Sequence, residues 1–262
     1  MDKRKRSFLK VAGSSIIGVL GLGWVRPVTA AQVPGATRKP VEALTGKRLA
    51  LAVDVKKCSL EKGCSACIDA CHSRHNVPTQ LQAEEEIKWI WKETYEHAFP
   101  TQAHRYTEST LKQQAVLVLC NHCENPPCVR VCPTQATWKR EGDGLIMMDQ
   151  HRCIGCRYCM VACPYGSRSF NWQDPRRSLG DQLNREYPTR MKGVVEKCNF
   201  CAERLVFGEE PLCVAACRSK SQALLFGDLE DPDSEISKTL KERHSIRRKP
   251  ALGTEPQVYY LV

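Results

Sequence analysis

The sequence predicts an α+β fold in which two intertwined halves, made of small antiparallel sheets and short helices, enclose a set of cysteine loops. Two observations support this prediction. All sixteen cysteines fall into four groups of four, with none left over, and a strand-like segment precedes each group. The unit of strand, cysteine loop and short helix therefore repeats four times. A chain of 262 residues accommodates it as one large domain or two small ones.

The first element, residues 1–30, is a predicted export signal with a cleavage site after Ala30. Lys3 to Arg6 form a basic start, and the apolar stretch of about 15 residues that follows is too short to span a bilayer comfortably. The run RSFLK from Arg6 resembles the second half of a twin-arginine signal, although Lys5 stands where the first arginine is usual. A general secretory signal and a retained membrane anchor are the alternatives.

A predicted linker over residues 31–47 leads into a double domain over residues 48–228. Its strand-like segments are RLALAVDV, AVLVL, LIMMD and MKGVVEK, and each runs into a cysteine group. ALLFGD supplies the strand expected after the fourth group. Short apolar or alternating runs of this kind are typical of strands.

Residues 72–114 are a predicted insert in the double domain, and residues 229–262 are a predicted C-terminal tail. EIKWIWKETYEHAFP, at the centre of the insert, predicts helix, on which Trp89 and Trp91 would lie on different faces. Packing on the core is the favoured role of both tryptophans, and contact with a partner is the alternative. The tail begins with a predicted helix cap at Asp233 and ends in PQVYYLV, a predicted last strand or docking arm.

The third cysteine group has the spacing of an iron–sulfur site. In CIGCRYCMVACP, gaps of two, two and three residues separate Cys153, Cys156, Cys159 and Cys163, and a proline follows. This is the bacterial ferredoxin signature, in which three thiolates bind one 4Fe–4S cluster and the fourth binds another. The two halves of the fold are therefore expected to be ferredoxin-like, and each group is expected to need a partner group.

The other three groups keep the final gap of three residues and vary elsewhere. The first group opens with a gap of five residues, the second has four in its middle gap, and the fourth has eleven. Their members are Cys58, Cys64, Cys67 and Cys71 in the first group, Cys120, Cys123, Cys128 and Cys132 in the second, and Cys198, Cys201, Cys213 and Cys217 in the fourth. All sixteen cysteines are predicted to be iron ligands of four 4Fe–4S clusters.

Other uses of these cysteines fit less well. Disulfide cysteines are usually scattered, and structural zinc prefers C-x2-C hooks separated by a longer loop, which the fourth group alone resembles. Covalent haem needs C-x2-C-H, which the first group does not contain. His72, His75 and His122 lie near cysteines and could tune a cluster by hydrogen bonding, although packing or solvent contact is their more ordinary role. No catalytic triad, phosphate loop or carboxylate pair is evident.

The formal charge of +10 does not indicate a nucleic-acid-binding protein. Outside residues 1–30 the chain carries 33 basic and 28 acidic residues, which leaves +5. Four cubanes held by thiolates would contribute about −8. The mature, loaded protein would then be slightly acidic, so nucleic acid is not an expected partner.

Three segments resemble a known family: CNHCENPPCVRVCPTQATWKR, CIGCRYCMVACPYGSRSFNW and KGVVEKCNFCAERL. They are similar to the four-cluster subunits of the formate dehydrogenase, polysulfide reductase and nitrite reductase-associated group. EIKWIWKETYEHAFP and the ending RRKPALGTEPQVYYLV resemble, more narrowly, the DsrO-type subunits of the DsrMKJOP transmembrane complexes of dissimilatory sulfur metabolism. The likeness covers most of residues 1–262.

The resemblance implies that the first and fourth groups interlock, and likewise the second and third. One cluster would take Cys58, Cys64, Cys67 and Cys217, and another Cys71, Cys198, Cys201 and Cys213. A third would take Cys120, Cys123, Cys128 and Cys163, and the last Cys132, Cys153, Cys156 and Cys159.

The resemblance also implies a periplasmic electron relay and not a catalyst. Its expected partners are an NrfD-type integral membrane quinone-interacting subunit, a multihaem cytochrome c and the other subunits of a transmembrane redox complex. The alternative is the β subunit of a periplasmic molybdopterin oxidoreductase, such as formate dehydrogenase or polysulfide reductase. Export after folding suits either role, because thiols that cross unfolded into an oxidising compartment are exposed to disulfide formation.

Overall fold

The computed structural model describes residues 43–60, 63–78 and 82–262. The predicted export signal lies outside the described residues, as does most of the predicted linker over 31–47. Among the helices of the described ranges, none is both long enough and apolar enough to cross a bilayer.

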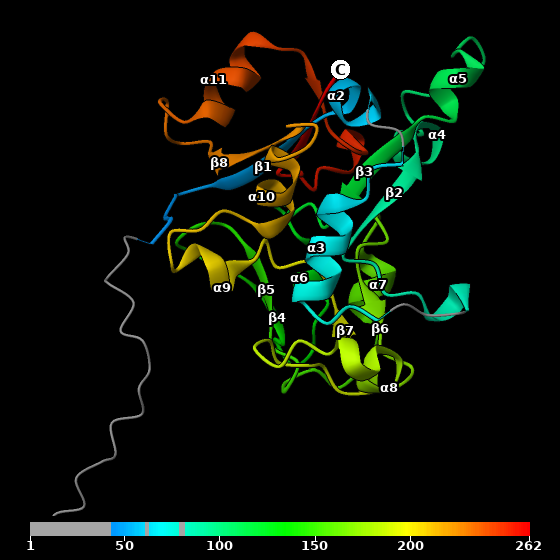
Figure 1. The fold of residues 1–262 in the computed structure, drawn as a ribbon, viewed down its shortest axis with the longest axis vertical. Helices are drawn as coiled ribbons and strands as arrows, with labels where there is room; N and C mark the ends of the chain where they lie inside the picture. Colours follow the sequence, from blue (N-terminus) through cyan, green and yellow to red (C-terminus); the bar gives the residue numbers. More distant parts are fainter. Residues whose placement is uncertain (1–42, 61–62, 79–81) are drawn as a thin grey trace, which may run out of the picture. The chain divides into compact units, whose positions relative to one another are not determined.

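The largest sheet has four strands in the order β8-β1-β10-β9 (Figure 1). Its strands are β1 (Leu49–Asp54), β8 (Leu224–Asp228), β9 (Ser245–Ile246) and β10 (Val258–Leu261). β1 pairs antiparallel with β8, whereas β10, the strand predicted in the tail, pairs parallel with β1. Every residue of β1 is buried, because one face packs on the main core and the other on α11 (Glu235–Glu242).

Three two-stranded antiparallel sheets complete the β structure of the described ranges. They pair β2 (Ile90–Thr94) with β3 (Ala115–Leu119), β4 (Thr137–Lys139) with β5 (Ile146–Met148), and β6 (Ser169–Phe170) with β7 (Val195–Glu196). The strands predicted before the cysteine groups are confirmed as β1, β3, β5 and β7, and the strand predicted after the fourth group is β8. The small sheets and short helices confirm the predicted α+β class.

The helix predicted for the centre of the insert is wrong over its first half. Ile90–Thr94 of this segment form β2, paired with β3, and the one-turn helix α4 (Tyr95–Ala98) follows. Aromatic and β-branched residues favour a strand where a neighbouring strand offers an edge, and β3 offers one. Trp89 is buried, which confirms its packing role: its ring stacks on His75 at 4.7 Å and its Nε1 donates to Glu196 at 2.6 Å. Trp91 is half-buried.

Short helices carry or border the cysteines. They are α2 (Val55–Leu60), α3 (Ala66–Arg74), α6 (Pro127–Arg130), α7 (Tyr158–Ala162), α9 (Ala202–Leu205) and α10 (Leu212–Arg218). α3 packs against α10, and α6 packs against α7. Helices of the first and fourth groups therefore meet, as do helices of the second and third, and this is how the halves intertwine (Figure 1).

The remaining helices of the described ranges lie in connecting segments. They are α5 (Ser109–Lys112), α8 (Pro175–Leu179) and the single 3-10 turns at Ala83–Glu85, Gly180–Gln182 and Pro250–Leu252. In the tail, the hydroxyl of Ser234 accepts a hydrogen bond from the Ser237 N–H at 3.2 Å and caps α11. The cap therefore lies one residue after the predicted position at Asp233.

Candidate metal centres

The structure gathers thiols from different cysteine groups into common sites, and all sixteen are free thiols. Quartet I is Cys58, Cys64, Cys67 and Cys217, whose thiols interact electrostatically around Cys67. Quartet II is Cys71, Cys198, Cys201 and Cys213, which interact around Cys71. Quartet III is Cys120, Cys123, Cys128 and Cys163, which interact around Cys123 and line one cavity.

We define quartet IV as Cys132, Cys153, Cys156 and Cys159. The structure brings Cys153 and Cys159 together in electrostatic contact. Cys132 follows α6, which packs against the α7 helix that carries Cys159. Cys156 is exposed, unlike the other fifteen cysteines. The thiols of quartets I to III therefore converge, and quartet IV extends from the buried Cys159 to the exposed Cys156. The role of each thiol as an iron ligand stays a prediction.

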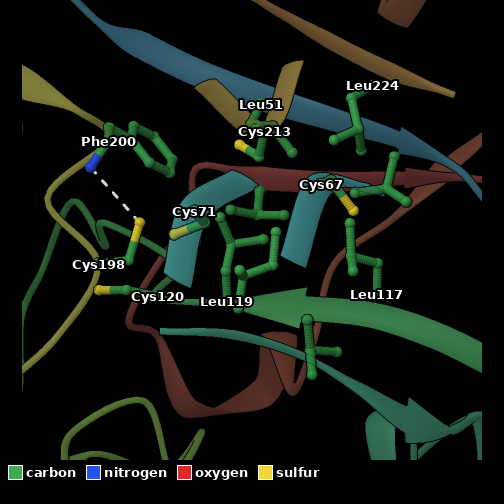
Figure 2. Packing of buried hydrophobic residues seen from close by; sticks show 14 of the residues in the cluster. Leu51, Cys67, Cys71, Leu117, Leu119, Cys120, Cys198, Phe200, Cys213 and Leu224 are labelled. Atoms are coloured by element: carbon green, nitrogen blue, oxygen red, sulfur yellow. Dashed lines mark hydrogen bonds between the residues drawn. The ribbon is translucent and has the colours of Figure 1, made fainter. Parts of the chain in front are cut away.

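The final three-residue gap explains how one cysteine group serves two quartets. A helical residue and the fourth residue after it lie on the same face, about one turn apart. Cys67 and Cys71 have this relation on α3, from which Figure 2 shows them projecting, and Cys213 and Cys217 have it on α10. On each helix, one thiol therefore belongs to quartet I and the other to quartet II.

The four loops also share a backbone feature. The residue before the second cysteine has a positive φ in every group, at Gly63 (77°), His122 (43°), Gly155 (70°) and Phe200 (54°). Such a residue can turn successive N–H groups toward one side, which forms a concavity that suits an anion or an iron–sulfur cluster. At Gly155 a Cβ atom would lie 2.3 Å from the carbonyl oxygen of Gly193, so this loop requires glycine. The four loops thus share a positive φ at the same position although their spacings differ.

Backbone N–H groups donate hydrogen bonds to several of these thiols. The donor–sulfur distances are 3.5 Å from Val195 to Cys153, 3.4 Å from Phe200 to Cys198, 3.4 Å from Leu212 to Cys201 and 3.2 Å from Ala223 to Cys217. Figure 2 shows the bond from Phe200. Donors of this kind favour the thiolate form of a cysteine over the neutral thiol.

Burial opposes ionisation of the thiols in the converging quartets. It raises the pKa of Cys67 to about 12, and the neighbouring thiols of Cys58 and Cys217 add to the effect. Burial also raises the pKa of Cys71 and Cys213 well above the usual thiol value. Four buried thiols become thiolates together only where a cation compensates them, and a bound metal supplies that compensation. The donor sets therefore fit a thiolate-bound metal cluster.

Two buried polar groups beside quartet III have no hydrogen-bond partner within the part of the chain that the structure describes. They are the amide of Asn121 and Nε2 of His122. The Ile146 N–H donates to Nδ1 of His122 at 3.0 Å, which places the ring proton on Nε2. Burial holds the pKa of His122 well below its ordinary value, so the ring is neutral. Orphaned donors fit a site that offers sulfur acceptors.

His75 borders quartet II. Its Nδ1 lies 2.9 Å from the carbonyl oxygen of Cys71 and 3.6 Å from that residue's Sγ, and its Nε2 lies 2.8 Å from Glu203. Burial alone would lower the pKa of His75, but hydrogen bonds to Cys201 and Glu203 outweigh it and raise the pKa to about 9. His72 bonds to the Ile90 carbonyl at 3.2 Å instead. Two of the three histidines noted in the sequence therefore border the quartets.

Two buried cations near the quartets were not predicted from the sequence. Arg168 Nη2 donates to Cys128 Sγ at 3.1 Å and to Thr137 Oγ1 at 2.8 Å. Lys197 Nζ donates to the Cys198 carbonyl at 2.7 Å. The available signal was position: Arg168 lies five residues after Cys163, and Lys197 directly precedes Cys198.

The quartets form a linear series. Cys213 interacts electrostatically with Cys67, which joins quartets II and I. Cys198 interacts with Cys120, which joins quartets II and III, and Figure 2 shows these two side chains close together. Cys159 interacts with Cys128, which joins quartets IV and III. The order in space is therefore I, II, III, IV, which differs from the order of the cysteine groups along the chain.

Comparisons with known proteins agree with this chemistry. Residues 57–136, 111–178 and 145–218 match family models that are each described as a 4Fe-4S dicluster domain. The chain is 39% identical to the Hdr-like menaquinol oxidoreductase iron-sulfur subunit 1 of Archaeoglobus fulgidus, over 98% of this chain and 97% of that protein. It is 35% identical to the menaquinone reductase iron-sulfur cluster-binding subunit of Nitratidesulfovibrio vulgaris, over 80% and 87%. It is 34% identical to the arsenate respiratory reductase iron-sulfur subunit ArrB of a Shewanella species, over 82% and 96%.

Proposed function

The chain belongs to the 4Fe-4S ferredoxin-type family of iron–sulfur electron-transfer subunits of oxidoreductase complexes, and from this premise we propose a specific role. It is a non-catalytic relay that carries electrons through four 4Fe–4S clusters, one in each quartet, with the sixteen cysteines as iron ligands. The electrons pass between an NrfD-type membrane quinone-interacting subunit and a multihaem cytochrome c.

The linear order of the quartets is the observation that carries this proposal. Each quartet interacts electrostatically with the next through a pair of thiols, so clusters bound there would follow one another in the order I, II, III, IV. At one end Cys58 and Cys64 are half-buried, and at the other end Cys156 is exposed. A series that begins and ends near the surface and is buried between suits passage of electrons from one partner to another.

The chain's own residues hold this path in place. When bound, a 4Fe–4S cluster takes up one electron and gives it back. The cysteine thiolates fix each site, the buried core around quartets II and III excludes water, and backbone N–H groups point at sulfur. Hydrogen bonds to sulfur and burial are the means by which a protein sets a cluster's reduction potential.

The surface around Cys156 is proposed as the docking site of one partner subunit. Ile154, Tyr158 and Val161 are 66%, 62% and 88% exposed, and they lie on the cysteine loop of quartet IV and on α7. Exposed groups of large apolar side chains mark interaction sites in proteins. Docking here would bring the partner's cofactor next to the most accessible thiol of the series.

The complex proposed is a DsrMKJOP-type assembly of dissimilatory sulfur metabolism at the periplasmic face of the membrane. The likeness of the insert and of the C-terminal segment to DsrO-type subunits supports this assignment. The menaquinol oxidoreductase subunit of A. fulgidus, similar over nearly the full chain, supports a quinone-linked complex. The twin-arginine-like run RSFLK supports export in the folded state.

A β subunit of a molybdopterin oxidoreductase is the second candidate. The similarity to ArrB of the Shewanella species favours it, because that protein is named as the iron-sulfur subunit of a respiratory reductase. Purification of the native complex separates the two candidates. A pterin-containing subunit that co-purifies supports the second candidate, and a haem-containing subunit supports the first.

The test of the four-cluster relay is a metal analysis of anaerobically purified protein. We expect about sixteen iron and sixteen acid-labile sulfide per chain, and a broad visible absorbance that dithionite bleaches. An iron-poor protein that is fully folded would overturn the proposal. A content of about twelve would reduce it to three clusters.

A further inference from the structure

Arg168 and Lys197 are buried cations without a carboxylate partner. Their side chains are almost inaccessible, with relative exposures of 4% and 3% for the two residues. The partners of Arg168 are the Cys128 sulfur, the Thr137 hydroxyl and, at 3.6 Å, the Met148 sulfur, and those of Lys197 are the carbonyls of Ile146 and Cys198. Within the described residues no Asp or Glu forms an ion pair with either cation. Charges buried in this way are costly unless something compensates them.

Two other buried arginines give the comparison. Within the described residues Arg248 also lacks a carboxylate partner, and it contacts the Ala98 carbonyl and the Tyr165 ring, whereas Arg190 has a carboxylate. Arg190 is as buried as Arg168, but its guanidinium lies 2.5 Å from the carboxylate of Glu196. The chain therefore has the means to pair a buried cation with a carboxylate. It does not do so at Arg168 or Lys197, so the negative charge that compensates them comes from another source.

The cysteine thiols, as thiolates, are the available source of this negative charge. Arg168 interacts electrostatically with Cys128, Cys159 and Cys120. Lys197 interacts with Cys120, Cys198 and Cys128. Cys120 and Cys128 are common to both cations, and both belong to quartet III. The two cations also interact with each other, so both charges lie beside quartet III. Lys197 interacts in addition with Cys198 of quartet II, and Arg168 with Cys159 of quartet IV.

We propose that Arg168 and Lys197 raise the reduction potential of the cluster in quartet III and make it the resting place of an electron in the series. The proposal rests on the function proposed above. Uptake of an electron adds one negative charge to that site while the neighbouring cluster that gave it is oxidised by one. A nearby buried cation stabilises the added charge, because the low dielectric of the interior screens it little.

Of the two side chains, Arg168 carries its positive charge under all conditions, because arginine stays protonated in proteins. Quartet I offers the contrast. The cation beside it, Lys92, donates to the Cys64 carbonyl at 2.5 Å but is exposed, so solvent and salt screen its charge. Arg168 and Lys92 therefore differ in two respects: Arg168 is buried and donates to a cysteine sulfur, whereas Lys92 is exposed and donates to a cysteine carbonyl.

The test is an EPR-monitored redox titration of anaerobically purified Arg168→Gln, Lys197→Gln and Arg168→Lys variants, with Lys92→Gln as the matched control. For each glutamine variant at quartet III we expect one cluster to show a reduced-to-oxidised ratio at least about tenfold lower at a fixed potential, which is about 59 mV for one electron. Arg168→Lys should recover most of the shift, and Lys92→Gln should change the ratio less than about threefold.

Iron and sulfide analysis of each variant separates failure of this inference from failure of the relay. An unsubstituted protein that is folded but has no clusters contradicts the proposed function. A protein with all four clusters and unchanged potentials in both glutamine variants overturns the inference alone. The signal that shifts must also be the one that Cys123→Ser alters, because that cysteine belongs to quartet III. A shift confined to any other cluster contradicts the assignment.

If the glutamine variants do not assemble, a redox titration of the unsubstituted protein tests the inference. As the potential is lowered, the first cluster to be reduced should be the one whose signal Cys123→Ser alters. If a different cluster is reduced first, quartet III is not the resting place of the electron and the inference is wrong.

Discussion

Substitution of Gly155 by alanine tests whether the left-handed loop conformation contributes to the metal sites. Gly155 has a φ of +70°, and a Cβ there would lie 2.3 Å from the Gly193 carbonyl oxygen. The Cys153–Cys156 loop and the Gly193 segment must separate by about 0.7 Å before this contact reaches 3.0 Å, the shortest that real Cβ atoms tolerate. The alanine therefore strains the loop of quartet IV in two ways.

The two costs can be estimated separately. A left-handed backbone costs an L-residue about 1–2 kcal/mol, and forcing an extra methyl into a packed site typically costs about 1–3 kcal/mol more. Gly155→Ala should then destabilise the protein by about 2–5 kcal/mol. Gly63 is the matched control, because it precedes the second cysteine of its own group with a φ of +77°, yet a Cβ added there would meet no atom of the described residues within 4 Å. Gly63→Ala should cost about 1–2 kcal/mol.

The assay is anaerobic guanidinium denaturation, followed by loss of the visible absorbance and by far-UV circular dichroism. For a slope of about 5 kcal/mol per M, Gly155→Ala should lower the midpoint by about 0.4–1 M, and Gly63→Ala by at most about half of that. Equal midpoints for the two variants would show that the Gly193 contact carries no energy. A wild-type midpoint for Gly155→Ala would refute the whole steric argument.

Three further predictions follow from the described contacts. Cys217→Ser should lower the iron content by about four atoms per chain and remove the EPR signal of quartet I while quartet II keeps its own; loss of quartet II alone would contradict the interlocked assignment. Glu196→Gln should destabilise the protein by about 3–5 kcal/mol in thermal or chemical denaturation, because it leaves a buried guanidinium unpaired. Glu186→Gln, at an exposed ion pair, should cost less than about 1 kcal/mol, and equal costs would contradict the role of burial. Val161→Glu should reduce the fraction of tagged chain recovered with its membrane complex at least about tenfold without loss of iron, whereas Val206→Glu, at the end of α9 and at a residue that is 55% exposed, should not; equal recovery would exclude the Cys156 surface as the docking site.

The local features of this protein were predictable because short-range sequence encodes them. Each strand next to a cysteine group is an apolar run of a few residues, and such runs appear in the structure as β1, β3, β5, β7 and β8. The final gap of three residues in each group is the spacing of one helical turn, and α3 and α10 carry it as helix. Strands and helical turns of this kind can be predicted from the sequence before any tertiary contact is known.

The features that the sequence did not reveal depend on distant partners. Residues Ile90–Thr94 form a strand because β3 lies beside them, although the surrounding segment alone suggested helix. β10 pairs parallel with β1 across about 200 residues of chain, and no local pattern encodes such a partner. Arg168 and Lys197 look like ordinary surface cations in the sequence, and only the fold buries them next to thiols. Net charge gave no indication of where those charges lie.

The distinction between locally encoded features and features that depend on distant partners also applies to the steps of the proposed relay. The step between quartets I and II is set by α3 and α10, each of which contributes a thiol to both, so the separation is fixed by one helical turn. Between III and IV the same three-residue gap separates Cys128 from Cys132 and Cys159 from Cys163, with one cysteine of each pair assigned to each quartet. Here the second cysteine of each pair lies beyond the last residue of its helix, α6 or α7.

No helical turn joins quartets II and III. Their junction is a tertiary contact between Cys198 and Cys120, supported by the stacking of His122 on Phe200 at 3.9 Å and by Lys197 between the two sites. The outer steps of the series are therefore encoded in local spacing and withstand changes elsewhere in the fold. The middle step depends on how the two halves pack, so substitutions that loosen the core should affect it first.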